Sequence, residues 1–531
     1  MFLAGCMLVA FAVRYSLLPE NGVVNGDGMY YTLLGERLVD GDIWNGLSAY
    51  WSPVYSFLTG VATLVVERDS AGRWISLLAG VSLVAPSYLL MRDMFGAVAA
   101  RAGMVLLVFH PFLVLASGWV MTESLYAFVF TTALCVGWRA LSSFSSISFA
   151  ITGILWGVSF LVKPEAIGYA VAMAVLLTGF LWVKSVSFAR IGTGLLSFII
   201  GFLVLTFPYV LFLYQKTGDW TISQKIAVNF PAVDFEGELL ELSPSGNLTM
   251  KDRVWGDDYE TGFAMSTPSA TSGKASSSRD LISDLSILGS KAATLLRKQI
   301  RDYFPALIPI PLALVAVFGF VGGHWSRERL SKEFYLVVFL LSTLLGYAAS
   351  AVELRYLFPI IPLLIGWVAN GVTVLGSILR PAFQRAAGQR WALNAPSLSI
   401  FLAVLLLVPV IPLYGIVFKT AAIADVPFEE KAAGLWIATH TAAKSPVVMS
   451  AHITPAFYAQ ASHIYLPDED VNTVVNYASR RDVDYFVISN RRWKETPYLD
   501  PPSIAEHPRL NLVHEVRIDE DHAAYIYALQ K

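Results

Sequence analysis

The chain is a succession of long apolar runs separated by short polar segments. A run of about 17–25 apolar residues is long enough to cross the hydrocarbon core of a bilayer as a helix. The runs do not alternate with the two-residue period of barrel strands, so they predict helices. We expect a polytopic α-helical membrane protein with about 11 spans, at 2–18, 72–91, 102–117, 124–141, 147–162, 166–183, 191–214, 304–323, 334–351, 356–377 and 396–417.

The segment 50–66 is apolar but short, and it carries Ser52 and Pro53 near its start. If it lies in the interface without crossing, every short basic loop falls on one side of the membrane, as the positive-inside rule requires. We therefore predict a juxtamembrane helix at 50–66 and a cytoplasmic N-terminus. The first run has no basic segment before it, which favours a retained span over a cleaved signal peptide. The loops concerned carry Arg92, Arg101, Arg139, Lys184, Arg190, Arg327, Arg329, Lys332, Arg380, Arg385 and Arg390.

This topology collects the remaining polar segments on the outer face. Function is expected there, because polar groups that converge at an apolar boundary are costly unless they serve a purpose. The segments are the loop 19–71, the turns 117–124 and 162–165, the loop 215–303, the turn 352–356 and the region from about 419 onward.

Two outer segments have a recognisable pattern of their own. In the loop 215–303, the stretch "STPSATSGKASSSRD" has linker composition. Apolar residues then recur at three- and four-residue steps (Leu281, Leu285, Leu288, Ala292, Leu295), which predicts an amphipathic helix along the bilayer surface. The region 419–531 alternates helix and strand patterns and predicts a small α/β domain, with a helix in "EEKAAGLWIATHT", a strand in "PVVMSAH", a helix and strand in "VNTVVNYASRRDVDYFVIS" and two strands in "LNLVHEVRIDEDHAAYIYAL".

Composition narrows the functional classes. Charged residues make up 15% of the chain, against about 25% in soluble domains. A net charge of −2 gives no indication of a nucleic-acid partner. Cys6 and Cys135 both lie in apolar runs and are interpreted as small buried hydrophobes. No Walker loop, GxGxxG, zinc-ligand spacing or GxSxG elbow occurs, so nucleotide chemistry is not indicated.

Asp27 stands out in "VVNGDGMYY", between two glycines and just before Tyr30 and Tyr31. As an isolated residue it is more often the cap of a helix that starts near Met29. The alternative is a general base at the lipid–water boundary, with the tyrosine pair as a wall. The two interpretations are compatible, because a cap is also a rigid mount.

Other charged residues lie in short outer turns. Glu123 either follows an N-cap at Thr122 or is a functional carboxylate, with about even odds from the residue pattern. Lys163 and Glu165 flank Pro164, where a snorkelling lysine and an ordinary first-turn glutamate are the favoured interpretation.

Arg355 opens an apolar span on the side that has few basic turns. Its planar fork of donors suits phosphate oxygens. The alternative is a simple pair with Glu353. His110, before Pro111, is interpreted as a packed or cavity-lining histidine.

The order of these motifs resembles the GT-C membrane glycosyltransferases, in particular the protein O-mannosyltransferase and lipid A aminoarabinose transferase group. The likeness runs in order over roughly 20–370, through "NGDGMYYTLLGERLVDGDIW", "YWSPVYSFLTG", "ASGWVMTESLYAFVF", "LVKPEAIGY" and "ELRYLFPIIPLL". Each motif alone is weak. The resemblance implies a GT-C-like catalytic domain over 1–418 and an outer domain over 419–531, in an inner (plasma) membrane of a bacterium with the site on the periplasmic side.

Members of that family transfer a sugar, with inversion, from a polyprenyl-phosphate donor to an acceptor on the outer face. The resemblance implies Asp27 as the base, Glu123 as a second catalytic carboxylate, and Arg355 with Lys163 at the donor phosphate. Substrate contacts are then expected from Tyr30, Tyr31, Glu165 and Glu353. The acceptor is a glycan, a lipid or a protein.

Two positions depart from the family pattern. Many relatives have two prolines preceded by Lys or His where this chain has "WSPVY", and the mannosyltransferases often have Asp-Glu where Gly28 follows Asp27. The departures weaken any assignment of the donor sugar and acceptor to those two activities.

The residue types fit the chemistry. An attacking hydroxyl needs one carboxylate to take its proton, and an inverting displacement needs no second nucleophilic carboxylate. The leaving phosphate needs charge stabilisation by Arg or Lys or by a divalent metal, for which the sequence specifies no ligands. The rival class is a transporter or lipid flippase, which would place ionisable residues in mid-span and show internal repeats.

Overall fold

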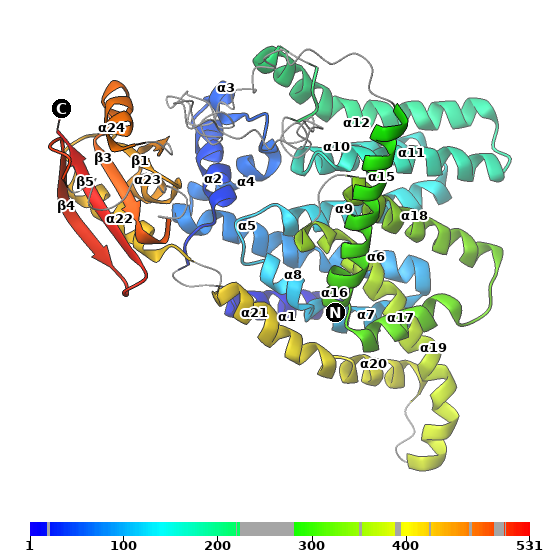
Figure 1. Ribbon diagram of the computed structural model, residues 1–531. Helices are drawn as coiled ribbons and strands as arrows, with labels where there is room; N and C mark the ends of the chain where they lie inside the picture. The colour runs from blue at the N-terminus through cyan, green and yellow to red at the C-terminus, as the bar shows by residue number, and fades with distance from the viewer. Residues whose placement is uncertain are drawn as a thin grey trace.

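The computed structural model describes residues 1–18, 22–218, 220–223, 281–349, 353–387, 394–423, 426–466, 470–492, 504 and 506–530. A bundle of helices that lie side by side forms its larger part, and a smaller α/β domain lies beyond one end of the bundle (Figure 1). The predicted linker in the loop 215–303 lies outside the described residues.

Within the described residues, each predicted apolar run forms one or more helices. The bundle is built from α1 (Phe2–Ser16), α5 (Arg68–Ser82), α6 (Val84–Phe95), α7 (Ala97–Val108), α8 (Pro111–Ala116), α9 (Glu123–Ser143), α10 (Ser146–Val162), α11 (Ala166–Val183), α12 (Phe188–Thr217), α15 (Leu281–Lys298), η1 (Gln299–Tyr303), α16 (Phe304–Leu307), α17 (Ile310–Val321), α18 (Arg327–Ala349), η2 (Leu354–Ile360), α19 (Ile361–Ala387), α20 (Ala395–Leu405), η4 (Val408–Val410) and α21 (Ile411–Ile423).

The described part of the chain holds seven helices long and apolar enough to cross a membrane, or eight if one bent pair counts as a single span. That pair, Gly289–Leu307 and Ile310–Val321, is bent by 101°. Three of the predicted spans form shorter apolar helices, namely α1, α7 and α10. The run 102–117 is divided at His110 and Pro111, because proline disfavours a helical conformation in the residue before it.

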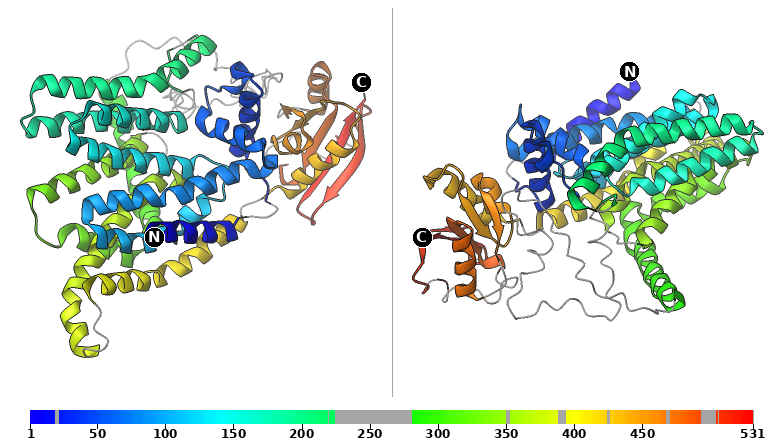
Figure 2. Two further views of the ribbon diagram at one scale, coloured as in Figure 1. Left: turned by 180° about the vertical axis from the view of Figure 1, so that it is seen from behind. Right: turned by 90° about the horizontal axis from the view of Figure 1, so that it is seen from above.

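The helix of the segment 50–66 is too short to cross a bilayer, which agrees with its prediction as a juxtamembrane helix. The helix α4 (Pro53–Thr63) has 11 residues, or about 16 Å of helix, against a hydrocarbon core of about 30 Å. It packs closely along α2 (Gly26–Val39), where a Cβ added at Gly35 would lie 2.1 Å from the Ser56 carbonyl oxygen. With the short α3 (Ile43–Gly46), these helices lie between the bundle and the α/β domain (Figures 1 and 2).

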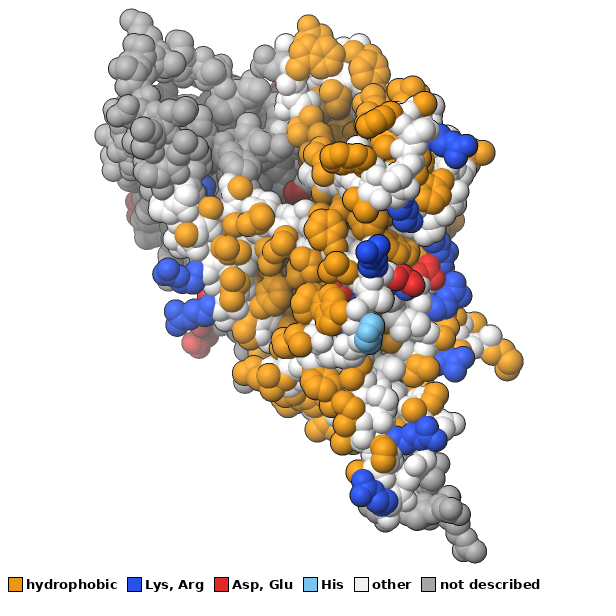
Figure 3. Space-filling view, turned by 90° about the vertical axis from the view of Figure 1, so that its right-hand side faces the viewer, with side chains coloured by type: hydrophobic (Ala, Val, Ile, Leu, Met, Phe, Trp, Pro, Cys, Tyr) orange, Lys and Arg blue, Asp and Glu red, His pale blue; other side chains and the backbone are white. Residues whose placement is uncertain are grey.

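The opposite end of the bundle is basic. Figure 3 looks onto this end, where Lys and Arg side chains gather and Asp and Glu are few. Arg92, Lys184, Arg190 and Arg327 lie at helix ends or in turns here, as the prediction that short basic loops share one side requires.

The α/β domain contains a five-stranded sheet of order β2-β1-β3-β5-β4. The first three strands pair in parallel and β5 runs antiparallel to both its neighbours. The strand β2 is an addition to the predicted elements. The bounds are α22 (Phe428–His440), β1 (Val447–Ser450), α23 (Thr454–Ala459), β2 (Ser462–Tyr465), α24 (Val471–Arg480), β3 (Tyr485–Ser489), η5 (Asn490–Arg492), β4 (Leu510–Arg517) and β5 (Ala523–Leu529).

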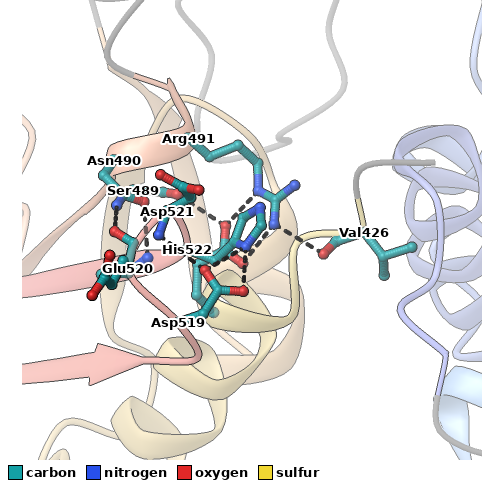
Figure 4. Close-up of polar contacts among 10 residues, drawn as sticks. Val426, Ser489, Asn490, Arg491, Asp519, Glu520, Asp521 and His522 are labelled. Carbon is teal, nitrogen blue, oxygen red and sulfur yellow. Dashed lines mark hydrogen bonds and ion pairs between the residues drawn. The ribbon is translucent and has the colours of Figure 1, made fainter. Parts of the chain in front are cut away.

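A buried ion pair joins α22, the first helix of this domain, to η5 at the end of β3 (Figure 4). The Arg491 guanidinium donates to both carboxylate oxygens of Glu429, at 2.7 and 3.0 Å, and to the Val426 carbonyl at 3.2 Å. Ser489, at the end of β3, donates to the same carboxylate at 3.0 Å. The side chains of Arg491 and Glu429 are 6% and 0% exposed, so neither charge is solvated by water in place of its partner.

We expect Arg491→Met to lower the free energy of unfolding of the α/β domain by about 3–5 kcal/mol, because it leaves the Glu429 carboxylate buried without its cation. The change is measured by urea denaturation of the full chain, with limited proteolysis of the α/β domain as the readout of its unfolding. The matched control is Arg517→Met, which removes an exposed pair with Glu515. Equal denaturation midpoints for the two variants would contradict the assignment.

Candidate active site

Three carboxylates from separate parts of the chain converge on Arg355. Its Nε lies 2.6 Å from Glu353 and 4.0 Å from Glu123, and its Nη1 lies 3.8 Å from Asp27. Asp27 belongs to the first turn of α2, Glu123 begins α9, and Glu353 directly precedes η2. The structure thus brings together the residues that the sequence separates by more than three hundred positions.

Asp27 is not the cap of its helix. The helix α2 begins at Gly26 with Asn25 as its N-cap, so the expected start near Met29 is wrong and Asp27 is the second helical residue. A negative charge in the first turn still suits the helix N-terminus. The Asp27 side chain is 35% exposed, which leaves it open on one side.

Glu123 is enclosed. Its side chain is 2% exposed, and its Oε1 accepts a hydrogen bond from Lys163 Nζ at 3.1 Å. Within the described residues, the other carboxylate oxygen is buried and has no hydrogen-bond partner. Glu123 therefore links the two cations of the site, Lys163 and Arg355.

Lys163 points into the protein. Its side chain is 8% exposed, and its Nζ lies 5.1 Å from the ring centre of Tyr356 and 5.6 Å from that of Tyr126. The expectation that Lys163 snorkels toward water is therefore wrong, because Glu123 and the two rings compensate its charge inside the molecule.

The predicted tyrosine pair divides into two roles. Tyr31 contacts Tyr55 edge-on, with ring centres 5.1 Å apart. Burial raises the pKa of Tyr31, and the negative charges of Asp27 and Glu123 raise it further, so its hydroxyl stays neutral beside the site. Tyr30 instead stacks on Trp51 and shares a hydrogen bond with Tyr465 of β2, so it joins α2 to the α/β domain.

The other two residues predicted to contact substrate, Glu353 and Glu165, also differ in their surroundings. Glu353 is 54% exposed and accepts from Arg355 and, at 3.2 Å, from the Tyr356 hydroxyl. Glu165 occupies the N-cap position of α11 and is partly buried. It makes no ion pair with any residue in the described ranges, which agrees with its interpretation as a helix-start residue.

Close packing fixes the turn 117–122 beside α2. A Cβ added at Gly28 would lie 2.7 Å from both the Cβ and the carbonyl oxygen of Val120. The Met121 carbonyl accepts from Ser76 at 3.2 Å, and Met121 Sδ lies 3.1 Å from Arg355 Nη1. The glycine after Asp27 is therefore required by the contact between α2 and this turn.

Sequence reasoning missed several supporting residues. The buried Arg14 of α1 donates to Ser117 at 3.2 Å and to the Val108 carbonyl at 3.1 Å, so it holds the start of the same turn. Tyr50 lies near Asp27, and burial, followed by the charge of Asp27, raises the pKa of Tyr50 to about 12. The position of Arg14 inside the first apolar run was the sequence signal that could have identified it, because charged residues within such runs are usually paired or functional.

The divalent metal that the sequence leaves open has no preformed ligand group among the described residues. No group of three His, Cys, Asp or Glu in the described ranges could hold a metal ion. The carboxylates of Asp27, Glu123 and Glu353 are directed at the Arg355 guanidinium, so a protein cation already compensates them.

The fold resembles that of the GT-C membrane glycosyltransferases, as comparison with solved structures shows. Residues 51–212 match the model of the dolichyl-phosphate-mannose-protein mannosyltransferases. The resemblance predicted from the sequence is confirmed. Comparison with curated protein sequences finds no significant match.

Solved structures of two such enzymes share the fold. The oligosaccharyltransferase of Archaeoglobus fulgidus, in complex with Zn and sulfate, is 14% identical with a TM-score of 0.59, over 93% of this chain and 68% of that one. ArnT from Cupriavidus metallidurans, bound to undecaprenyl phosphate, is 14% identical with a TM-score of 0.56, over 99% and 97%. AglB from Archaeoglobus fulgidus, in complex with an inhibitory peptide and a dolichol-phosphate, is 14% identical with a TM-score of 0.56, over 93% of this chain and 70% of that one.

We expect Gly28→Ala to lower the free energy of unfolding by about 1–3 kcal/mol, because the added methyl group overlaps the Val120 backbone and moves α2. The melting temperature of the purified protein measures this. Gly26→Ala is the matched control, since a Cβ at Gly26 meets nothing within 4 Å. If both variants melt at the wild-type temperature, the close contact does not fix α2.

Proposed function

We propose that this protein transfers a sugar from a polyprenyl-phosphate carrier to a hydroxyl of an acceptor at the membrane face beside the α/β domain. The observation that carries the proposal is the meeting of Asp27, in the first turn of α2, with Glu123 and Arg355 in one site. The undecaprenyl phosphate bound to ArnT, and the dolichol-phosphate and inhibitory peptide bound to AglB, support a lipid-linked donor and a separate acceptor.

Asp27 is the base in this proposal. Its carboxylate takes the proton of the acceptor hydroxyl while the hydroxyl oxygen attacks the anomeric carbon. The new carbon–oxygen bond forms as the bond to the phosphate oxygen breaks, and the polyprenyl phosphate leaves with the electron pair. One displacement inverts the anomeric configuration and needs no covalent intermediate.

Arg355 stabilises the phosphate as its charge develops. The distance of 3.8 Å between Asp27 and Arg355 Nη1 exceeds a hydrogen bond, so the base is near the cation without being locked to it. Glu123 and Lys163 lie deeper. With 2% of its side chain exposed, Glu123 acts by holding Arg355 and Lys163 in place rather than by contacting the acceptor.

The proposed location is the inner (plasma) membrane of a bacterium, with the site and the α/β domain on the periplasmic side. The gathering of Lys and Arg at the opposite end of the bundle supports this orientation, since cytoplasmic loops carry an excess of these residues (Figure 3). The acceptor is a glycolipid, a polysaccharide or a protein.

We expect Asp27→Asn to reduce transfer by about 10²–10⁴-fold, because an amide cannot accept the proton. Mass spectrometry of envelope glycolipids, polysaccharides and glycoproteins, from cells with and without the protein, identifies the modified acceptor. The wild-type gene should restore the modification and the variant should not. Asp482→Asn, in an exposed turn of the α/β domain, is the control. A folded Asp27→Asn protein with wild-type turnover would refute the base assignment.

We expect Arg355→Ala to raise the KM for the lipid donor by about 10–100-fold, the loss of one charge-assisted contact of about 1.5–3 kcal/mol. Arg355→Lys keeps the charge but not the planar donors, so its donor KM should lie between those of the wild type and Arg355→Ala. Steady-state kinetics with purified donor measure both. Arg301→Ala, which removes a side chain that is 82% exposed, is the control. An unchanged donor KM in Arg355→Ala would remove Arg355 from the phosphate site.

A further inference from the structure

The buried Arg14 guanidinium is a charge that the proposed reaction does not use directly. It lies in the last turn of α1, within an apolar run, and 1% of the residue is exposed. Its hydrogen bonds within the described ranges all go to neutral oxygens, those of Ala10, Val108 and Ser117, and not to a carboxylate. A charge at such a place is costly, and ionisable residues at membrane depth are usually functional.

Arg14 joins the two halves of a broken span. Val108 is the last residue of α7, so its carbonyl has no partner within that helix, and Arg14 Nη1 donates to it at 3.1 Å. Ser117 follows α8, and its hydroxyl accepts from Arg14 Nε at 3.2 Å and donates to the Leu113 carbonyl at 2.7 Å. The planar guanidinium therefore fixes the end of α7 relative to the end of α8. A lysine ammonium is a point charge and lacks this fork of donors.

The helix α5 also supports the turn that begins at Ser117. A Cβ added at Gly80 would lie 2.1 Å from Ser117 Oγ and 3.3 Å from Arg14 Nε, so α5 packs directly against the bonded pair. Ser76, one turn earlier in α5, donates to the Met121 carbonyl at 3.2 Å. The turn is therefore fixed at its first residue and again near its end.

The same turn contacts both α2 and the proposed phosphate site. Met121 Sδ lies 3.1 Å from Arg355 Nη1, and Glu123, two residues later, begins α9. Val120 packs against Gly28 in the first turn of α2. A displacement of the turn would therefore move the Glu123 carboxylate and the Arg355 guanidinium together.

We propose that Arg14 is a positioning residue of the transferase, which holds the turn 117–122 and thereby sets where the Arg355 guanidinium meets the donor phosphate. The proposal rests on the proposed function. Arg14 is enclosed between α1, α5, α7 and α8, so it acts through the turn and not by contact with a substrate. Because a small displacement of a binding group is enough to weaken its action, loss of the Arg14 guanidinium weakens phosphate binding although every phosphate contact is still present.

Binding of farnesyl phosphate, a short polyprenyl phosphate, tests this role without requiring turnover. In isothermal titration calorimetry of the solubilised full chain, we expect Arg14→Met to raise the Kd about tenfold or more. Ser117→Ala removes one acceptor of Arg14 and should raise the Kd about three- to fivefold. Arg190→Met, which removes an exposed arginine at the start of α12, is the matched control and should bind like the wild type. A merely structural role of Arg14 would lower the binding stoichiometry at an unchanged Kd, and that result would overturn the proposal.

A double-mutant cycle identifies the group through which Arg14 acts. In an Arg355→Ala background, Arg14→Met should cause little further rise in the Kd, because the group that Arg14 positions is absent. The same fold rise in both backgrounds would refute the connection between the turn and the phosphate site.

The titration also separates this role from the proposed function. Farnesyl phosphate binding that depends on Arg14, in a wild-type protein that transfers no sugar, would refute the transferase function and keep Arg14 as the residue that positions a phosphate site. Sugar transfer by the wild type, with an equal Kd in Arg14→Met, would refute the positioning role alone. A wild-type protein that binds no farnesyl phosphate would refute the phosphate site and both proposals with it.

Discussion

The arrangement of the site depends on the burial of one charge, the Glu123 carboxylate. A carboxylate with 2% of its side chain exposed at the edge of a membrane bundle is costly unless cations compensate it. Lys163 and Arg355 supply that compensation from two other turns of the chain. The requirement draws the ends of α10 and η2 toward α9, and so it places Arg355 where Asp27 can meet it.

The α/β domain completes this arrangement from the outside. The Tyr458 hydroxyl accepts from the Val24 backbone at 3.1 Å, just ahead of α2, and Tyr30 within α2 is bonded to Tyr465. Lys431 of α22 lies 3.3 Å from Asp69 at the start of α5. The helix that carries Asp27 is therefore held on one side by the bundle and on the other by the domain, which makes it a rigid mount rather than a free loop.

Much of this was accessible from the sequence, because the bilayer restricts what an apolar run can become. The runs predicted helices, and the distribution of arginine and lysine predicted that the segments of Asp27, Glu123 and Arg355 share one end. The details that failed depend on three-dimensional packing. No pattern indicated that Lys163 turns inward to Glu123 or that Tyr30 faces β2. The four residues "SHIY" of β2 are too few, and alternate too little between polar and apolar, to predict a strand.

The glycine after Asp27 has an evolutionary consequence. The resemblance to the mannosyltransferases includes positions where a glutamate follows the first-loop aspartate, yet here the Cβ of any such residue would fall on Val120. Positions 28 and 120 therefore cannot change independently: a side chain gained at 28 requires the turn at 120 to retreat first. Within this fold, the size of the residue after Asp27 is therefore coupled to the position of the turn that carries Val120.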